Sequence, residues 1–200
     1  MKILVNGRNL EGKRTGVGRY LANILRIWTN ENTNHQFKLY YKDETSSDGF
    51  NNSSNVISTL VPNSKILDYG PIWENIYLPK ALNNNSSADL YFTSNYTLPI
   101  APLKFREAVT IFDISYIAHP EWFPTRNLVA LKLLTGPTVK RADIILTGSE
   151  ATKKEILKYY DINHEKIHVT NLGVDQEFIE LEKNSSEEKI EALKKKHNIS

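Results

Sequence analysis

Short apolar runs alternate with amphipathic stretches along most of the chain. The runs have the length of strands and are bounded by turn-forming Gly, Asn, Asp and Ser residues. We therefore predict strands in the segments KILVN, QFKLYY, VISTLV, ADLYFTS, EAVTIFD, ADIILTG and KIHVTNLGVD. After the first of them, apolar residues recur at the spacing of one helix face, at Leu21, Ile24, Leu25 and Trp28.

Four further helices are predicted from the same kind of spacing. The first starts near Pro71, and the second covers 126–141. The third follows the N-cap residue Ser149, and the fourth covers 187–197. A break or kink is expected at Gly136-Pro137, because proline lacks a backbone N–H. The residues expected to face inward from the second helix are Ile72, Trp73, Ile76 and Tyr77. Residues 42–55 are rich in Asp, Ser, Asn and Gly and predict a loop.

Strands that alternate with helices predict an α/β fold with a Rossmann-like parallel sheet and helices on both faces. Functional groups in such folds gather at the carboxyl ends of the strands. The loops after Asn6, Ser94, Asp113 and Gly148 are therefore expected to share one rim.

Composition narrows the classes of protein that remain. Hydrophobic residues make up 40% of the chain and charged residues 24%, which is the balance of a soluble globular domain. A net charge of +2 is too small to indicate nucleic acid as a partner. The chain has no cysteine, so it forms no disulfide and no thiolate metal site, which fits a reducing compartment. The segment MKILVNGRNL predicts a first strand rather than a signal peptide.

The segment TGVGRY opens the first helix and is a candidate anion site. Its glycines would let the backbone N–H groups of Gly16, Val17 and Gly18 approach a phosphate at the helix N-terminus. The alternative is that the glycines only allow the chain to turn into the helix. A dinucleotide-binding dehydrogenase is disfavoured, because the third glycine of that fingerprint is absent and the loop is too long.

The segment FDISYIAHPEWFP follows a predicted strand and is unusually aromatic. Asp113 ends the strand, and His119, Glu121 and Trp122 follow in a proline-bounded loop. Aromatic rings interspersed with hydrogen-bonding groups suit a sugar. The alternatives are a packed loop and, for Asp113, a helix cap. No set of His, Asp and Glu has zinc spacing, and no Ser or Cys nucleophile motif is present.

Four blocks together carry a resemblance to a known family. GRNLEGKRTGVGRY, FDISYIAHPEWFP, RADIILTGSEATKKEI and KIHVTNLGVDQEF resemble, in order and spacing, the N-terminal halves of retaining GT-B glycosyltransferases of family four, glycosyl transferases group 1. The resemblance covers the chain from Lys2 to Phe178. It implies the N-terminal, acceptor-side half of a GT-B fold over 1–178, with 179–200 as a linker and helix leading to an absent C-terminal donor-binding domain.

The resemblance also implies roles for individual residues. Gly16, Val17 and Gly18 would approach the donor diphosphate, and Asp113 would be the catalytic residue. The residues expected to bind sugar or acceptor are Arg8, Arg19, Phe112, Tyr116, His119, Glu121 and Trp122. No cofactor and no metal are implied, because the nucleotide-sugar donor is itself a substrate. The acceptor would be a glycan or a lipid-linked glycan, in a cytoplasmic setting that allows peripheral contact with the inner face of the membrane.

Two positions depart from the family pattern. The usual His-Asp pair is here Phe112-Asp113, and the usual Asp-Ala-Arg after the first strand is Asn6-Gly7-Arg8. With half of the cleft absent, the leaving diphosphate cannot be stabilised, so we expect the 200-residue chain alone to be inactive. The function predicted is a hexosyltransferase-like enzyme half acting in surface polysaccharide synthesis. The alternative is a non-catalytic carbohydrate- or partner-binding module.

Overall fold

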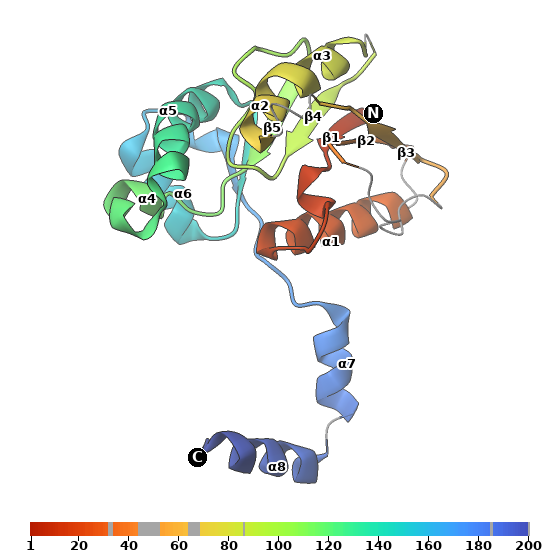
Figure 1. Ribbon diagram of the computed structural model, residues 1–200, viewed down its shortest axis with the longest axis vertical. Helices are drawn as coiled ribbons and strands as arrows, with labels where there is room; N and C mark the ends of the chain where they lie inside the picture. The colour runs from red at the N-terminus through yellow and green to blue at the C-terminus, as the bar shows by residue number, and fades with distance from the viewer. Residues whose placement is uncertain (32–33, 44–52, 64–68, 86, 185, 200) are drawn as a thin grey trace.

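The chain forms one parallel β-sheet with helices on both faces. The computed structural model describes residues 1–31, 34–43, 53–63, 69–85, 87–184 and 186–199. In this part of the chain the sheet has seven strands in the order β3-β2-β1-β4-β5-β6-β7, and every neighbouring pair is parallel (Figure 1). The strands are β1 (Lys2–Asn6), β2 (Gln36–Tyr41), β3 (Val56–Leu60), β4 (Leu90–Thr93), β5 (Arg106–Thr110), β6 (Ile144–Thr147) and β7 (Ile167–Val169).

Helices connect β1 to β2, β3 to β4, β5 to β6 and β6 to β7, which suits crossovers between parallel strands, whereas β4 leads to β5 through a loop. The α-helices are α1 (Gly16–Asn30), α2 (Gly70–Ile72), α3 (Leu78–Asn83), α4 (Ser115–Ala118), α5 (Thr125–Arg141), α6 (Glu150–Tyr159), α7 (Gln176–Asn184) and α8 (Glu187–His197). A π-helical turn, η3 (Trp73–Tyr77), joins α2 to α3. Short 3-10 helices are η1 (Arg8–Leu10), η4 (Pro120–Trp122) and η5 (His164–Lys166).

The alternation of side chains along each strand produces two apolar layers. Leu4 of β1 belongs to the cluster that contains Trp73, Val139 and Ile156, so this face is covered by η3, α5 and α6. The neighbouring β1 residues Ile3 and Val5 belong to the second cluster, which is covered by α1 through Leu21 and Leu25. The predicted Rossmann-like α/β fold is thus confirmed, and its interior strands are buried on both faces.

The strand order reverses between β1 and β4. The chain builds β2 and β3 on one side of β1 and then returns to lay β4 and the later strands on the other side. At such a switch point the loops after the two central strands run in opposite directions and leave a crevice. The loops after Asn6 and Thr93 therefore flank the position where this fold binds ligands.

Three sequence predictions need correction or restriction. Helix α5 continues through Gly136 and Pro137 without the expected break. Pro137 removes the hydrogen bond to the Leu133 carbonyl, but both residues are exposed, so water can replace the lost donor. Ile76 is 47% exposed rather than buried, because the wider π-helical turn moves the inward position from Ile76 to Leu78. Most of the predicted loop over 42–55 lies outside the described residues.

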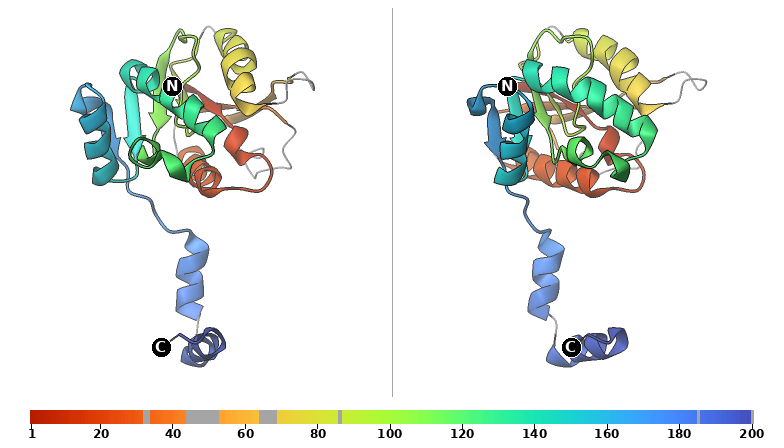
Figure 2. Two further views of the ribbon diagram at one scale, coloured as in Figure 1. Left: turned by 60° about the vertical axis from the view of Figure 1, so that its left-hand side comes forward. Right: turned by 90° about the vertical axis from the view of Figure 1, so that its left-hand side faces the viewer.

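Two helices follow the sheet without packing on it. Figures 1 and 2 show α7 and α8 leading away from the sheet and its covering helices. The sequence predicted α8 but not α7, whose nine residues begin with no side-chain cap among the contacts described. No helix in the described residues is long and apolar enough to cross a membrane.

Candidate functional site

A network of polar side chains lies at the β1/β4 switch point. It comprises Asn6, Arg8, Asn9, Glu74, Thr93, Ser94 and Asn95, and we call it the rim network. Asn9 donates through Nδ2 to Ser94 Oγ at 3.0 Å and to Asn95 Oδ1 at 2.5 Å. These bonds join the loop after β1 to the loop after β4, so the two sides of the crevice are held in one arrangement.

Glu74 is the centre of the rim network. Its Oε1 accepts from Arg8 Nε at 2.9 Å, from Asn6 Nδ2 at 3.0 Å, and from Asn95 Nδ2. The Glu74 side chain is only 13% exposed, so each of these bonds lies in an environment that strengthens electrostatic attraction. Glu74 lies in the π-helical turn η3, a distortion that is often found at functional sites. Arg8 was predicted from the sequence but Glu74 was not, because 66 residues separate the two in the sequence.

Residues 15–18 (TGVG), which we call the glycine loop, lead from the rim into the first turn of α1. Thr15 caps the helix by accepting a hydrogen bond from the Gly18 N–H at 3.4 Å. A β-carbon on Gly18 would lie 2.3 Å from the Asn9 carbonyl oxygen, so only glycine fits there. A β-carbon on Gly16 would meet nothing within 4 Å, which leaves the start of the helix open to a ligand. Val17 is partly buried, and Arg19 is exposed.

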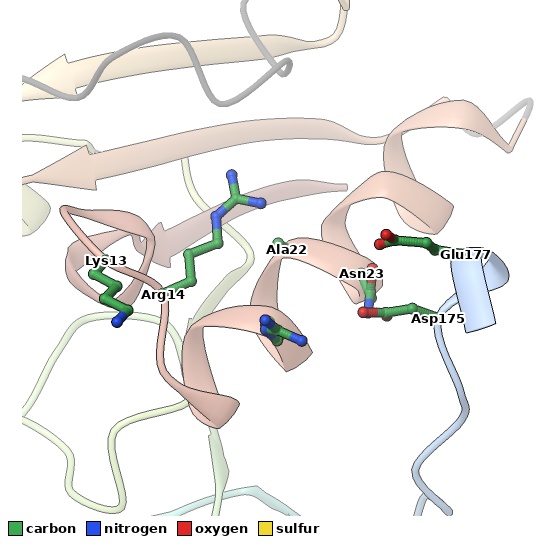
Figure 3. A pocket seen from close by; sticks show the side chains of 7 residues that line it. Lys13, Arg14, Ala22, Asn23, Asp175 and Glu177 are labelled. Atoms are coloured by element: carbon green, nitrogen blue, oxygen red, sulfur yellow. The ribbon is translucent and has the colours of Figure 1, made fainter. Parts of the chain in front are cut away.

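A pocket of about 340 Å³ lies beside the start of α1. Its lining residues are Lys13, Arg14, Arg19, Ala22, Asn23, Asp175 and Glu177. Figure 3 shows Lys13 and Arg14 on the side of the glycine loop, and Asp175 and Glu177 on the opposite side. Asn23 donates a hydrogen bond to Asp175. Three cationic side chains and the positive N-terminal end of α1 thus lie on one side of the pocket, which suits an anion, and two carboxylates lie on the other side.

An aromatic cluster connects α1 to the end of β5. The ring of Phe112 contacts Tyr20 of α1 edge-on, with centroids 4.8 Å apart, and Tyr96 at 6.0 Å. The Tyr20 hydroxyl lies 3.3 Å from Thr110 Oγ1. Tyr96 has a φ of 60°, in the left-handed region that aromatic residues rarely adopt. This contact brings the glycine loop, the β4 loop and the Phe112 segment together at one rim, as the sequence predicted for the loops.

Asp113 is held by its neighbours on both carboxylate oxygens. Oδ1 accepts from the Ser115 backbone N–H at 3.0 Å and from Ser115 Oγ at 2.6 Å. Oδ2 accepts from the Tyr96 hydroxyl at 3.1 Å. Asp113 therefore fixes the start of α4 and the position of the Tyr96 ring, which is the capping role that the sequence left open beside the catalytic one.

The remaining candidates from the aromatic segment do not join the rim network. Tyr116 is 1% exposed, and its hydroxyl lies 3.1 Å from that of Tyr160, so this side chain belongs to the core and does not line a ligand surface. His119 and Trp122 are exposed and stack with ring centroids 4.0 Å apart. Glu121 Oε1 lies 3.2 Å from His119 Nδ1. These three residues precede α5 and lack contacts to the rim network among the hydrogen bonds described.

Alkaline pH is expected to destabilise the fold through Tyr96. Burial, and then the negative charge of Asp113, raise the pKa of the Tyr96 hydroxyl well above its usual value. Above about pH 10 the unfolded chain releases this proton while the folded chain retains it, so the free energy of unfolding falls as pH rises. Urea titrations between about pH 8 and pH 11 should show this fall, and Tyr96→Phe should make it shallower. An identical alkaline slope in the variant would contradict this assignment.

The fold is that of one half of the two-domain GT-B glycosyltransferases. HepE from Anabaena, solved in complex with UDP and glucose, matches with a TM-score of 0.57 and 18% identity over 98% of this chain. The lipopolysaccharide outer core galactosyltransferase WaaB, in its apo form, matches with a TM-score of 0.54 and 15% identity over 88% of this chain. The N-terminal domain of the Candida albicans trehalose-6-phosphate phosphatase matches with a TM-score of 0.54 and 13% identity over 97% of this chain.

This chain spans about half the length of the structures that it matches, with 50% of HepE, 46% of WaaB and 53% of the Candida domain covered. No family model matches the sequence, and no curated protein matches it significantly. At these identities the likeness establishes the fold and not the activity.

Proposed function

We propose that this chain is the acceptor-side domain of a retaining glycosyltransferase. In this proposal a sugar passes from a nucleotide-sugar donor to a glycan or lipid-linked acceptor in surface polysaccharide synthesis in the cytoplasm. The observation that carries the proposal is the position of the cationic pocket. Lys13, Arg14 and Arg19 lie around the start of α1, where Gly16 leaves space beside the backbone, at the rim where this fold binds ligands.

The cationic side of the pocket carries the charge that a sugar-nucleotide reaction requires, and Asp175 and Glu177 lie on the opposite side. The leaving diphosphate carries developing negative charge, and fixed cations and helix N–H groups stabilise it without reorganisation. In the proposal the N–H groups of Gly16 and Val17, together with Arg19, contact the diphosphate, whereas the Gly18 N–H is already bonded to Thr15. Phe112 and Asp113 lie at the end of β5, where the transferred sugar would lie. The ring contact between Tyr20 and Phe112 links this position to α1.

A second domain completes the cleft in this proposal. Residues 1–178 form the acceptor-side domain, and 179–200 lead toward a donor-binding domain. The direction of α7 and α8, away from the sheet, supports this division (Figure 2). Because half of a cleft neither aligns two sugars nor encloses the diphosphate, the 200-residue chain alone is proposed to be inactive.

One observation favours a second candidate, a non-catalytic carbohydrate- or partner-binding module. Both oxygens of Asp113 are already engaged by Ser115 and Tyr96, and the histidine expected beside it is Phe112. A module of this kind would bind a glycan without anion binding at the glycine loop.

A pyrophosphate titration followed by NMR tests the proposal. Inorganic pyrophosphate added to the labelled chain is expected to shift the backbone amide signals of Gly16, Val17 and Gly18, with an affinity in the millimolar range, roughly 4 kcal/mol. Arg19→Glu should weaken this binding about tenfold, because it reverses one charge at the site. Lys158→Glu is the matched control, since Lys158 is exposed on α6.

The same chain should show no turnover of nucleotide-sugars. Unchanged amide signals at the glycine loop would contradict the diphosphate site, and the binding module would remain as the candidate function. Glycan-induced shifts around Phe112 without any pyrophosphate effect would positively favour that module.

A further inference from the structure

The outward side of α5 exposes apolar and basic side chains together. Its inward side packs on the core, for example through Val139. Val129 is 52% exposed and Leu133 is 67% exposed, one helical turn apart. Lys132 and Lys140 are exposed at the same helical spacing, and we call these four exposed residues the α5 face. In Figure 2, right, α5 runs across the front of the molecule, and none of the described elements lies over it.

Helix α7 exposes apolar and acidic side chains. Phe178 is 54% exposed and Ile179 is 36% exposed, although both side chains are large and apolar. Glu177 and Glu180 are exposed in the same helix, and we call these four residues the α7 face. Isolated helices shorter than about 12–15 residues are barely stable in water, so α7, with nine residues, requires a packing partner.

The two faces carry opposite charge. Helix α5 contains four cationic residues and no Asp or Glu, whereas α7 contains three Glu and one Lys. Arg141 is engaged inward with Glu107 at 2.7 Å, whereas Lys132 and Lys140 are exposed. Helix α8 contains three Glu and four Lys and therefore lacks such a bias. The α5 face and the α7 face thus combine exposed apolar residues with complementary charge, which favours contact between them.

The start of α7 lies on the opposite side of the sheet from α5. Asn23 of α1 donates a hydrogen bond to Asp175, directly before α7. Helix α1 covers one face of the sheet, and α5 covers the other. A helix of nine residues is about 13 Å long, so α7 does not reach around the sheet to the α5 face of its own chain. A second copy of the chain can bring its α7 there.

We propose that two copies of the chain form a dimer in which the α7 face of each copy packs on the α5 face of the other. The apolar residues of the two faces pack together, and the glutamates of α7 lie beside the lysines of α5. One such contact involves a helix of nine residues and is smaller than the about 1,200 Å² that stable interfaces bury. A two-fold axis repeats the contact and limits the assembly to two chains. The proposal rests on these two faces and is independent of sugar transfer.

Sedimentation equilibrium of the 200-residue chain tests the proposal directly. Between about 1 μM and about 500 μM protein, the measured mass should rise from 22.9 kDa to twice this value, because small interfaces bind in the micromolar range. The dimer should be several-fold weaker in about 0.5 M salt, because salt screens the charges of the two faces.

Charge reversal on one face at a time identifies both surfaces. The first variant carries Lys132→Glu and Lys140→Glu, and the second carries Glu177→Lys and Glu180→Lys. Each variant alone brings like charges together at both contacts, so its dimer should be at least about tenfold weaker than the parent dimer. An equal mixture of the two variants should dimerise about as tightly as the parent chain, because each contact of the mixed dimer joins opposite charges.

Serine substitutions test the apolar part of the interface. Leu133→Ser on α5 and Phe178→Ser on α7 should each weaken the dimer at least about tenfold, since the two-fold axis removes the apolar contact twice. Leu193→Ser is the matched control, because Leu193 is 58% exposed but lies on α8, outside both faces. Lys195→Glu together with Lys196→Glu on α8 is the control for charge reversal, and both controls should dimerise as the parent chain does.

Three results would overturn the proposal. One is a parent chain that stays monomeric at about 500 μM in low salt. Another is a dimer that the α8 variants weaken and the α5 and α7 variants do not. The third is an equal mixture of the two charge-reversed variants that stays monomeric, since the α5 face and the α7 face then do not contact each other.

Discussion

Gly18→Ala should lower the free energy of unfolding by about 2–3 kcal/mol. The new β-carbon would lie 2.3 Å from the Asn9 carbonyl oxygen, which is part of the backbone and cannot rotate away. The loss occurs even though alanine is favoured over glycine in helices by about 1 kcal/mol. Either α1 or the turn at Asn9 must move, and Asn9 carries two hydrogen bonds of the rim network.

Gly16→Ala is the matched control, because it makes the same change two residues earlier in the same helix. Its β-carbon meets nothing within 4 Å, so the free energy of unfolding should stay within about 0.5 kcal/mol of the parent value. Urea unfolding of the two variants measures the difference. Equal stabilities would show that the approach of α1 to Asn9 is not as close as the structure has it.

Glu74→Ala should lower the free energy of unfolding by about 3 kcal/mol. The substitution removes the acceptor shared by Arg8, Asn6 and Asn95. Asn6 is 2% exposed, so its Nδ2 group would remain buried after losing its 3.0 Å acceptor, and it would keep the weaker 3.4 Å bond to Thr93. The loops after β1 and β4 should then separate, and their backbone amides should exchange hydrogen faster.

Two further variants serve as controls for the effect of Glu74→Ala on stability. Glu74→Gln keeps an acceptor oxygen and loses the charge, so it should be affected about half as much. Glu155→Ala removes an exposed carboxylate on α6 and should be nearly neutral. If Glu74→Ala and Glu155→Ala unfold at the same urea concentration, the rim network does not stabilise the domain.

The strands could be predicted from the sequence because the apolar pattern that marks each strand lies within a few consecutive residues. Each of β1, β2, β4, β5 and β6 is a short and largely apolar run bounded by turn residues, because most of its positions are buried. The N-cap role of Ser149 was also predicted correctly, since Ser149 caps α6 by accepting a hydrogen bond from the Thr152 N–H. Helix α7 was missed because Phe178, Ile179 and Leu181 are all at least 36% exposed and show no inward stripe.

The candidate site was only partly predictable, because its contacts join distant segments. The glycine loop and the Phe112 segment were found from their composition, and the structure places both at the rim. Glu74 could not be recognised from the sequence, because an acidic residue among the apolar residues of a helix is expected to be exposed to solvent. Tyr116 was misassigned because aromatic residues in a loop do not reveal their direction. The single turn α4 directs this one into the core.

The central position of β1 has a consequence for how the domain folds. The first strand of the chain pairs with β2 on one side and with β4 on the other, so its second partner arrives only after about ninety residues. The bonds of Asn6 to Thr93 and of Asn9 to Ser94 span 87 and 85 residues. Closing such long loops is slow and entropically unfavourable. The rim network therefore forms late in folding, and a partly folded chain with β1 to β3 assembled would expose β1 as an unpaired edge that favours aggregation.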